Sequence, residues 1–167
     1  MSVSITSSGR LSGSRSLLKA LPLLLFLPLL WADGAWAAEC AQTNYDFFTQ
    51  AEVDAFGATG CDSVRGDVLI NRLAGANIDG LANLTRVDGG LVIDNYKGAN
   101  IDGLKSLTSV GDDLRIWFNS NIANFDGLAN LTNVGGNLRI SANASLTNLN
   151  GLANLTSVGG FVYISSN

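Results

Sequence analysis

Residues 128–140 read Leu-Ala-Asn-Leu-Thr-Asn-Val-Gly-Gly-Asn-Leu-Arg-Ile, and residues 152–164 repeat them as Leu-Ala-Asn-Leu-Thr-Ser-Val-Gly-Gly-Phe-Val-Tyr-Ile. The valine of this phrase recurs along the chain at intervals of 23 or 24 residues, as Val64, Val87, Val110, Val134 and Val158. A fixed period of this length is typical of solenoids, in which stacked coils share one core that no single repeat can build alone.

Each repeat carries two apolar residues at the fourth and sixth positions after its valine, namely Val68 and Ile70, Leu91 and Ile93, Leu114 and Ile116, Leu138 and Ile140, and Val162 and Ile164. This alternation predicts one half-buried strand per coil. A Gly-Leu-x-x-Leu segment follows each turn and supplies the remaining inward side chains. The sequence therefore predicts a mainly β solenoid of parallel strands over residues 64–167.

Residues 38–63 differ from the repeats and are expected to form a cap. Thr49 and Glu52 have the spacing of a capping box, and Val53 and Phe56 give a short apolar face before Gly57. We therefore predict a short helix that ends at Gly57 and covers the first coil, because an open solenoid end exposes apolar side chains and unpaired strand edges.

Residues 1–37 have the order of a secretory signal peptide. Basic residues precede an apolar run at residues 20–31, and the small-residue triplet Ala35-Trp36-Ala37 follows. The alternative is a membrane anchor, but the run contains Pro22 and Pro28 and is shorter than the ~20 residues that a spanning helix needs. We expect a secreted, cell-surface or periplasmic protein without a membrane span, whose mature chain begins at Ala38.

Cys40 and Cys61 are the only cysteines of the chain. Export would place them in an oxidising compartment, where we expect a bridge that joins the cap to the first strand. Two free thiols are the alternative. Metal binding is disfavoured, because the chain has no histidine to complete a ligand set.

The cap phrase at residues 49–56, the Gly60-Cys61 pair and the repeated Leu-x-x-Leu-Thr-x-Val-Gly-Gly-x-Leu-x-Ile stretches together resemble receptor L domains. The resemblance covers residues 40–167. It implies a right-handed parallel β-helix related to leucine-rich repeats, outside the cell and with no catalytic residues or cofactor. The chain stops directly after a strand, so we expect that the natural domain continues beyond Asn167, and that the open edge around Val162 and Ile164 favours self-association.

An enzyme is the rival class, because parallel β-helices also carry polysaccharide-cleaving sites. Its candidate residues are Asp79, Asp102 and Asp126, which should stack in adjacent coils with Asn150 continuing the column. Each precedes a glycine, so turn formation explains them better than catalysis, with calcium bridging as a further alternative. The absence of histidine and a net charge of -4 argue against acid–base catalysis by histidine and against nucleic-acid binding.

Asparagines recur in register and are expected to be structural, bonding turn backbone groups and the next coil: Asn77, Asn100, Asn124 and Asn148, and Asn119, Asn143 and Asn167. Four glycosylation sequons are present, at Asn83, Asn130, Asn143 and Asn154. They would carry glycans only in a eukaryotic host.

The candidate binding surface is the outward face of the repeated strands, whose residues stand three, five and seven positions after each valine. The last three rows of this face collect aromatic and basic residues, namely Arg115, Trp117, Arg139, Phe161 and Tyr163. Such a mixture suits stacking on sugar rings or protein side chains. An ordinary solvated sheet face is the alternative. The sequence thus favours a recognition module for an extracellular protein or cell-surface glycan over a structural wall or envelope protein.

Overall fold

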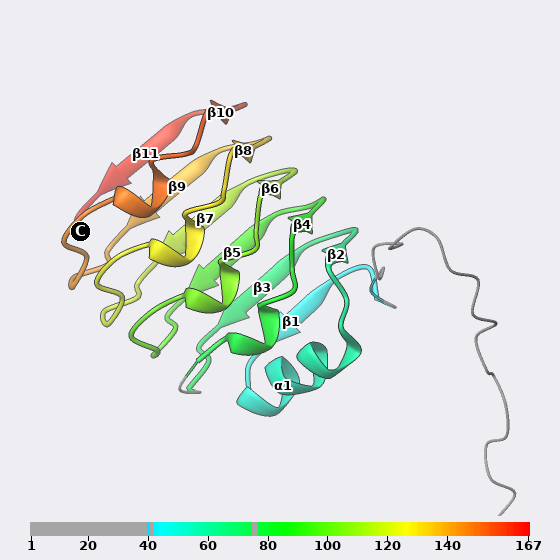
Figure 1. Ribbon diagram of the computed structural model, residues 1–167. Helices are drawn as coiled ribbons and strands as arrows, with labels where there is room; N and C mark the ends of the chain where they lie inside the picture. Colours follow the sequence, from blue (N-terminus) through cyan, green and yellow to red (C-terminus); the bar gives the residue numbers. More distant parts are fainter. Residues whose placement is uncertain (1–39, 41, 75–76) are drawn as a thin grey trace, which may run out of the picture. The chain divides into compact units, whose positions relative to one another are not determined.

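The computed structural model describes residue 40 and residues 42–74 and 77–167. The predicted signal peptide lies outside the described residues. The described chain is mainly β, and its two parallel sheets share a repeat of about 23 residues (Figure 1). The predicted parallel solenoid is confirmed.

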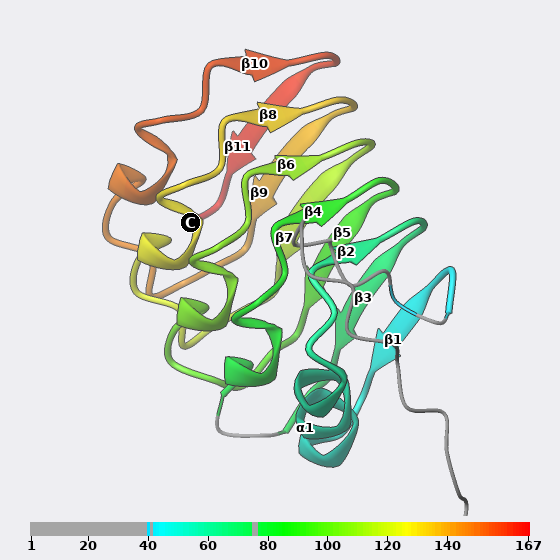
Figure 2. The same cartoon turned by 45° about the vertical axis from the view of Figure 1, so that its right-hand side comes forward.

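One sheet contains six strands, which follow one another along the stack in the order of the sequence. They are β1 (Tyr45–Phe47), β3 (Val68–Asn71), β5 (Leu91–Asp94), β7 (Leu114–Trp117), β9 (Leu138–Ser141) and β11 (Val162–Ser165). The other sheet is made of two-residue strands, β2 (Ser63–Val64), β4 (Arg86–Val87), β6 (Ser109–Val110), β8 (Asn133–Val134) and β10 (Ser157–Val158). All pairs in both sheets are parallel, and each coil contributes one strand to each sheet (Figure 2).

A column of one-turn 3₁₀ helices closes the third side of the coils, formed by η1 (Asp79–Leu81), η2 (Asp102–Leu104), η3 (Asp126–Leu128) and η4 (Asn150–Leu152). The coils approach each other closely here. A Cβ atom on Gly103 would lie 1.9 Å from the carbonyl oxygen of Ile78 in the preceding coil. The Asp-Gly-Leu phrase therefore places a glycine at the contact and buries the leucine in the core.

The core is a continuous stack of the predicted inward side chains. Leu91, Ile93, Leu114 and Ile116 are fully buried, and the register places Leu91 beside Leu114 and Ile93 beside Ile116. Each coil thus covers the apolar edge of its neighbour, as the repeat length requires.

The predicted capping helix is present as α1 (Gln50–Thr59). The Thr49 side chain accepts a hydrogen bond from the Glu52 amide, and the Glu52 carboxylate accepts bonds from the amides of Phe48 and Thr49 at 2.8 and 2.9 Å. These backbone bonds lower the pKa of Glu52. The capping box predicted from the sequence is confirmed.

The prediction that the helix ends at Gly57 is wrong. The helix continues to Thr59, and Gly60, in the left-handed conformation at φ 67°, caps it. Gly57 serves packing instead, because a Cβ atom there would lie 2.8 Å from the Cα atom of Gly80 in the first 3₁₀ turn. The helix therefore packs against η1, the first 3₁₀ helix of the column.

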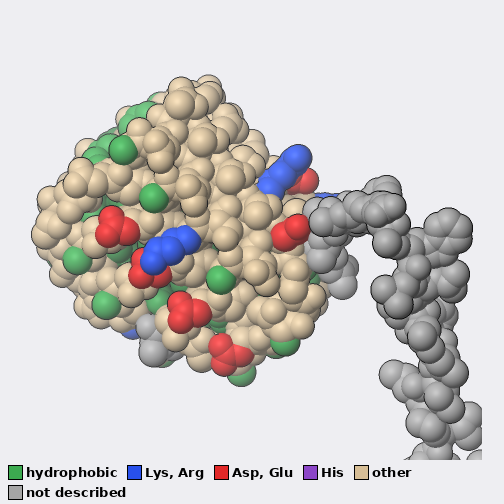
Figure 3. All heavy atoms as spheres, in the orientation of Figure 1, with side chains coloured by type: hydrophobic (Ala, Val, Ile, Leu, Met, Phe, Trp, Pro, Cys, Tyr) green, Lys and Arg blue, Asp and Glu red, His purple; other side chains and the backbone are tan. Residues whose placement is uncertain are grey.

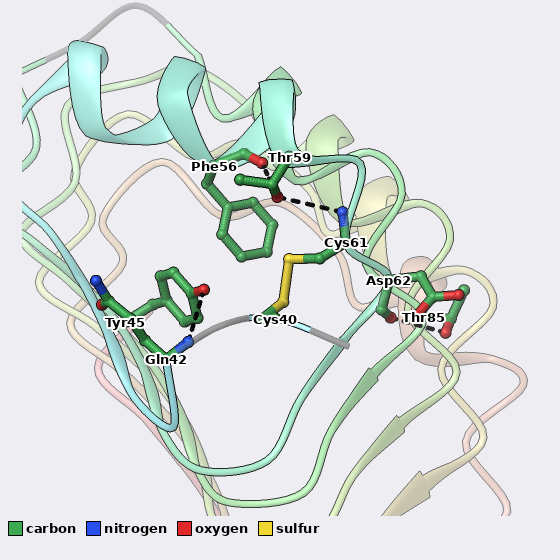
Figure 4. The surroundings of a disulfide bond; sticks show 8 residues. All are labelled: Cys40, Gln42, Tyr45, Phe56, Thr59, Cys61, Asp62 and Thr85. Atoms are coloured by element: carbon green, nitrogen blue, oxygen red, sulfur yellow. Dashed lines mark hydrogen bonds between the residues drawn. A yellow bond between two sulfur atoms is a disulfide. The ribbon is translucent and has the colours of Figure 1, made fainter. Parts of the chain in front are cut away.

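The predicted disulfide is present, with an S–S distance of 2.07 Å between Cys40 and Cys61 (Figure 4). The amide of Cys40 donates to the carbonyl of Ser63, and β1 pairs with β3 through Tyr45 and Val68. Cys40 and residues 42–62 thus belong to a modified coil of their own, and the bridge closes it. The rings of Tyr45 and Phe56 meet edge to face beside the bridge, with centroids 4.9 Å apart.

Side chains also link the coils in ladders parallel to the stack. Thr108 donates to the carbonyl of Thr85 at 2.9 Å, and Thr132 and Thr156 repeat the bond in the next two coils. Asn119 and Asn143 are fully buried, and Asn119 donates to the Asn143 side-chain oxygen at 3.0 Å. The row that begins with Asn77 differs, because each of its side chains accepts from the amide two residues later in its own turn.

Candidate functional site

The candidate residues come together on the outer face of the six-stranded sheet. In the register, Arg139 lies between Arg115 of β7 and Tyr163 of β11, and Trp117 pairs with Ser141 one row further along. The period of the repeat therefore places residues from three coils in one patch. We call Arg115, Trp117, Arg139 and Tyr163 the cation–aromatic cluster.

Arg139 is the centre of the cation–aromatic cluster. Its guanidinium carbon lies 5.1 Å from the ring centroid of Trp117 and 5.2 Å from that of Tyr163. Both distances lie within the range of cation–π attraction. Arg139 is exposed and forms no ion pair with any residue that the structure describes. Its positive charge is thus held in place by rings and is available to a ligand.

Arg115 belongs to the same cluster but has a partner. Its guanidinium lies 6.0 Å from the Trp117 ring and donates to the Asp113 carboxylate at 2.6 Å. The amide of Asn137 donates to the same carboxylate at 2.7 Å. This backbone bond first, and Arg115 second, lower the pKa of Asp113. Arg115 therefore contributes less free charge to the surface than Arg139 does.

Phe161 lies at the margin of the cluster. Its side chain is 61% exposed, and its amide donates to the side-chain oxygen of Asn137 at 3.0 Å. Within the described residues its ring stacks on no other ring and no cation. The structure thus joins four of the five predicted residues through a chain of cation–ring contacts and leaves the fifth exposed beside them.

The outward side chains three positions after each valine are not all available to a ligand, although the alternation places them on the surface. The Asp67 carboxylate accepts from the amide of Gly90 at 2.7 Å, and Asp113 and Asn137 accept from the next coil in the same way. These outward residues therefore form a further ladder that joins the coils. Their polar atoms are partly occupied by the fold rather than offered to a ligand.

Sequence reasoning missed an acidic hollow at the other end of this face. It encloses about 370 Å³, and its lining includes Asp46, Asp67, Asp112 and Arg115. Asp46 belongs to β1, which lies before the first repeat valine and was assigned to the cap. Extending the 23-residue spacing back from Leu69 would have found it, because the register pairs Asp46 with Leu69.

The predicted acidic column lies on a different side of the molecule. Asp79, Asp102 and Asp126 each begin a 3₁₀ turn, and Figure 3 shows acidic side chains in a row over this column. Their amides bond to the preceding asparagines, and Lys105 pairs with Asp102 at 3.2 Å. The described part of the chain contains no group of three acidic, cysteine or histidine residues that could hold a metal ion. The turn bonds are thus made by asparagine side chains and aspartate backbone amides, and of the three carboxylates only that of Asp102 has a partner within the described chain.

No protein-family model, curated protein or solved structure matches the chain. The fold and the disulfide define the class, a parallel β-solenoid with a disulfide-closed cap. Among the described residues, no helix has the length and apolar character needed to cross a membrane.

Proposed function

We propose that the protein is a non-catalytic recognition module, secreted, on the cell surface or in the periplasm, that binds a protein or a glycan through the outer face of its six-stranded sheet. The observation that carries this proposal is the position of Arg139 between the rings of Trp117 and Tyr163, without an acidic partner in the described chain. Arginine and aromatic side chains supply most of the energy at many binding surfaces.

The side chains of the cation–aromatic cluster are preorganised for binding. The side chains of Trp117, Arg139 and Tyr163 project from paired strands, and hydrogen bonds between coils fix the backbone beneath them. Binding then costs little additional side-chain entropy, because the guanidinium is already confined between two rings. The ring faces suit sugar rings or apolar side chains, and the cation suits an acidic group on either kind of ligand.

The extracellular location is part of the proposal. The Cys40–Cys61 disulfide supports it, because such bonds persist in oxidising compartments. The signal-like order of residues 1–37 and the resemblance to receptor L domains point the same way. That resemblance assigns no ligand-contact residue to this chain, so the binding surface is argued from the structure alone.

A structural wall or envelope protein is the rival. To separate the two, the purified protein is used to capture partners from solubilised extracellular proteins and, in parallel, is sedimented with purified cell-wall polysaccharide. The recognition proposal predicts saturable binding that both Trp117→Ala and Arg139→Ala weaken by ~1 kcal/mol or more, with circular dichroism unchanged.

Two variants serve as controls. Arg86→Ala removes an exposed arginine from the two-residue-strand sheet, where it pairs with Asp88, and Phe48→Ala removes an aromatic side chain that is 47% exposed outside the cluster. Both should bind as the wild type does. Equal binding by all four variants would move the site off this face, and insoluble assembly without saturable binding would favour the wall protein.

A further inference from the structure

A second hollow lies beside the ends of the strands of the six-stranded sheet and borders the cation–aromatic cluster, because the ring centroids of Phe118 and Trp117 lie 6.3 Å apart. It encloses about 420 Å³ and is lined by Arg72, Asp94, Asn95 and Phe118. These residues follow or end three successive strands, β3, β5 and β7. The repeat therefore brings one cation, one carboxylate, one amide and one aromatic ring to the same corner.

The backbone at this corner is left-handed in every repeat, with φ between 52° and 57° at Arg72, Asn95, Phe118, Ala142 and Ser166. Phenylalanine is a poor choice for this conformation, because bulky side chains rarely adopt positive φ. The residue is also 60% exposed, and its ring lies near that of Trp117 on the surface, so the core does not require it. The conformation recurs in every coil and belongs to the turn, so the feature to be explained is the exposed phenylalanine in this coil, where other coils carry Arg72 or Ala142.

The charged groups that line the hollow do not pair with each other. Arg72 and Asp94 line the same space but form no ion pair there, and Asp94 has no side-chain partner among the described residues. Asn71 and Trp117 flank Asp94 in the register. The Asn71 side-chain oxygen and the Trp117 Nε1 atom are buried and lack hydrogen-bond partners within the described chain. Because both atoms are buried, they are not offered to the hollow, whose available polar groups belong to Arg72, Asp94 and Asn95.

The main chain of the corner is already occupied. The amides of Arg72, Asn95 and Phe118 donate to carbonyls of the next coil at 2.9, 3.2 and 3.2 Å. A peptide could not add to these strands as a further strand, because the donors that it would need are bonded. A ligand of this corner must be recognised by side chains, through hydroxyl-type hydrogen bonds and ring stacking.

We infer that this hollow binds a neutral sugar unit of a glycan, an inference that rests on the proposed recognition function and names one class of its ligands. The exposed ring of Phe118 stacks on the apolar face of a pyranose. The Asp94 carboxylate accepts from sugar hydroxyls, and Arg72 and the Asn95 amide nitrogen donate to them. Asn95 is held for this role by Lys97, which donates to its side-chain oxygen. A neutral sugar fits because the two lining charges are opposite.

The test is calorimetric titration with four probes, the neutral tetrasaccharides of β-1,4-glucose, β-1,3-glucose, α-1,4-glucose and α-1,6-mannose. At least one is expected to bind the wild type. Phe118→Ala should weaken that binding about tenfold, the loss of one favourable ring contact, and Asp94→Asn should weaken it measurably. Phe118→Ala is expected to fold, since Ala142 occupies the same corner of the next coil at φ 57°.

The control variant is Arg86→Ala, which lies in the two-residue-strand sheet outside both surfaces and should leave tetrasaccharide binding unchanged. Failure of all four probes to bind, or equal binding by Phe118→Ala, would overturn the sugar site. Loss in Arg139→Ala without loss in Phe118→Ala would move sugar binding to the cation–aromatic cluster, which overturns this inference and leaves the proposed function standing. A captured protein whose binding requires Phe118 would also overturn the assignment to sugars.

Discussion

Tyr96 occupies the place in its coil that asparagine fills in the later coils, and its amide donates to the Asn119 side chain at 2.8 Å. The ring is fully buried, and the hydroxyl has no partner within the described chain. Burial, with a smaller contribution from Asp79, raises the pKa of Tyr96 to about 12. The fold therefore holds a neutral phenol that it leaves without a hydrogen bond.

We predict that Tyr96→Phe raises the free energy of unfolding by about 1 kcal/mol at neutral pH, because it removes an unsatisfied buried hydroxyl. The native pKa lies above the ordinary value of 10.0, so the wild type should lose stability as pH rises from about 10 towards 12, where the unfolded state ionises first. Tyr96→Phe should show less of this alkaline loss. Urea unfolding at pH 7 and pH 11 measures both effects, and a destabilised, equally alkali-sensitive variant would contradict the prediction.

The buried Asn143 bonds to the Asn119 and Asn167 coils and to the carbonyl of Ile116 at 3.0 Å. Asn143→Ala should lower the free energy of unfolding by about 2–4 kcal/mol, because it leaves buried backbone groups unpaired. Asn130→Ala is the matched control, since Asn130 is exposed and bonds a single carbonyl, that of Lys105. Urea denaturation of both variants tests the difference, and equal losses would contradict a structural role for the buried row.

At the scale of the elements, the cap coil depends on its covalent closure. The Cys40–Cys61 bridge spans 21 residues and includes α1 and β1. Replacing both cysteines by alanine should lower the free energy of unfolding by about 3 kcal/mol, because the unfolded chain gains conformational freedom. Thr49→Ala, which removes the N-cap side chain of α1, should lower the free energy of unfolding by about 1 kcal/mol. Urea unfolding in the oxidised state checks both, and an unchanged midpoint in the cysteine variant would show that the cap folds without its bridge.

The strands and their register could be predicted from the sequence, because the valine spacing fixes which residues of adjacent coils meet. Leu91 beside Leu114 and Arg115 beside Arg139 follow directly from the 23- and 24-residue intervals. The cap was harder. Strand β1 has no repeat valine before it, and Gly57 looks like a helix terminator until the contact with Gly80 is known. Close approach between coils depends on three-dimensional stacking, which a local pattern does not report.

The candidate site was predictable only as a face. Alternation placed Arg139 and Tyr163 outward, and the structure adds that the guanidinium lies against two rings. The same alternation placed Asp67 and Asn137 outward, yet their oxygens bond the next coil. Phe118 was not among the predicted residues because it follows the strand, at a position with positive φ. The residues at this position differ from coil to coil, so no common residue type in the sequence predicts its left-handed conformation. Side-chain partners, rather than strand positions, decide which groups remain available.

At the scale of the whole molecule, the last coil ends in an uncovered apolar edge. Val162 and Ile164 are 55% and 46% exposed, whereas Leu138 and Ile140, their counterparts one coil earlier, are almost fully buried. We predict that residues 40–167, produced on their own, self-associate through this edge. Light scattering should show a mass that rises with concentration, and Val162→Lys with Ile164→Lys should reduce it. Tyr163→Ala is the control, because its side chain faces outward. A monodisperse monomer with slow amide exchange at Val162 and Ile164 would contradict the prediction.

The binding surface that we propose is the outer face of the six-stranded sheet. Hydroxyl-radical footprinting tests it most directly, because exposed aromatic side chains are oxidised and a bound partner shields them. With a captured partner at saturating concentration, we expect reduced oxidation of Trp117 and Tyr163 and unchanged oxidation of Phe48. Unchanged oxidation of Trp117 and Tyr163 at full occupancy would place the binding surface elsewhere on the solenoid.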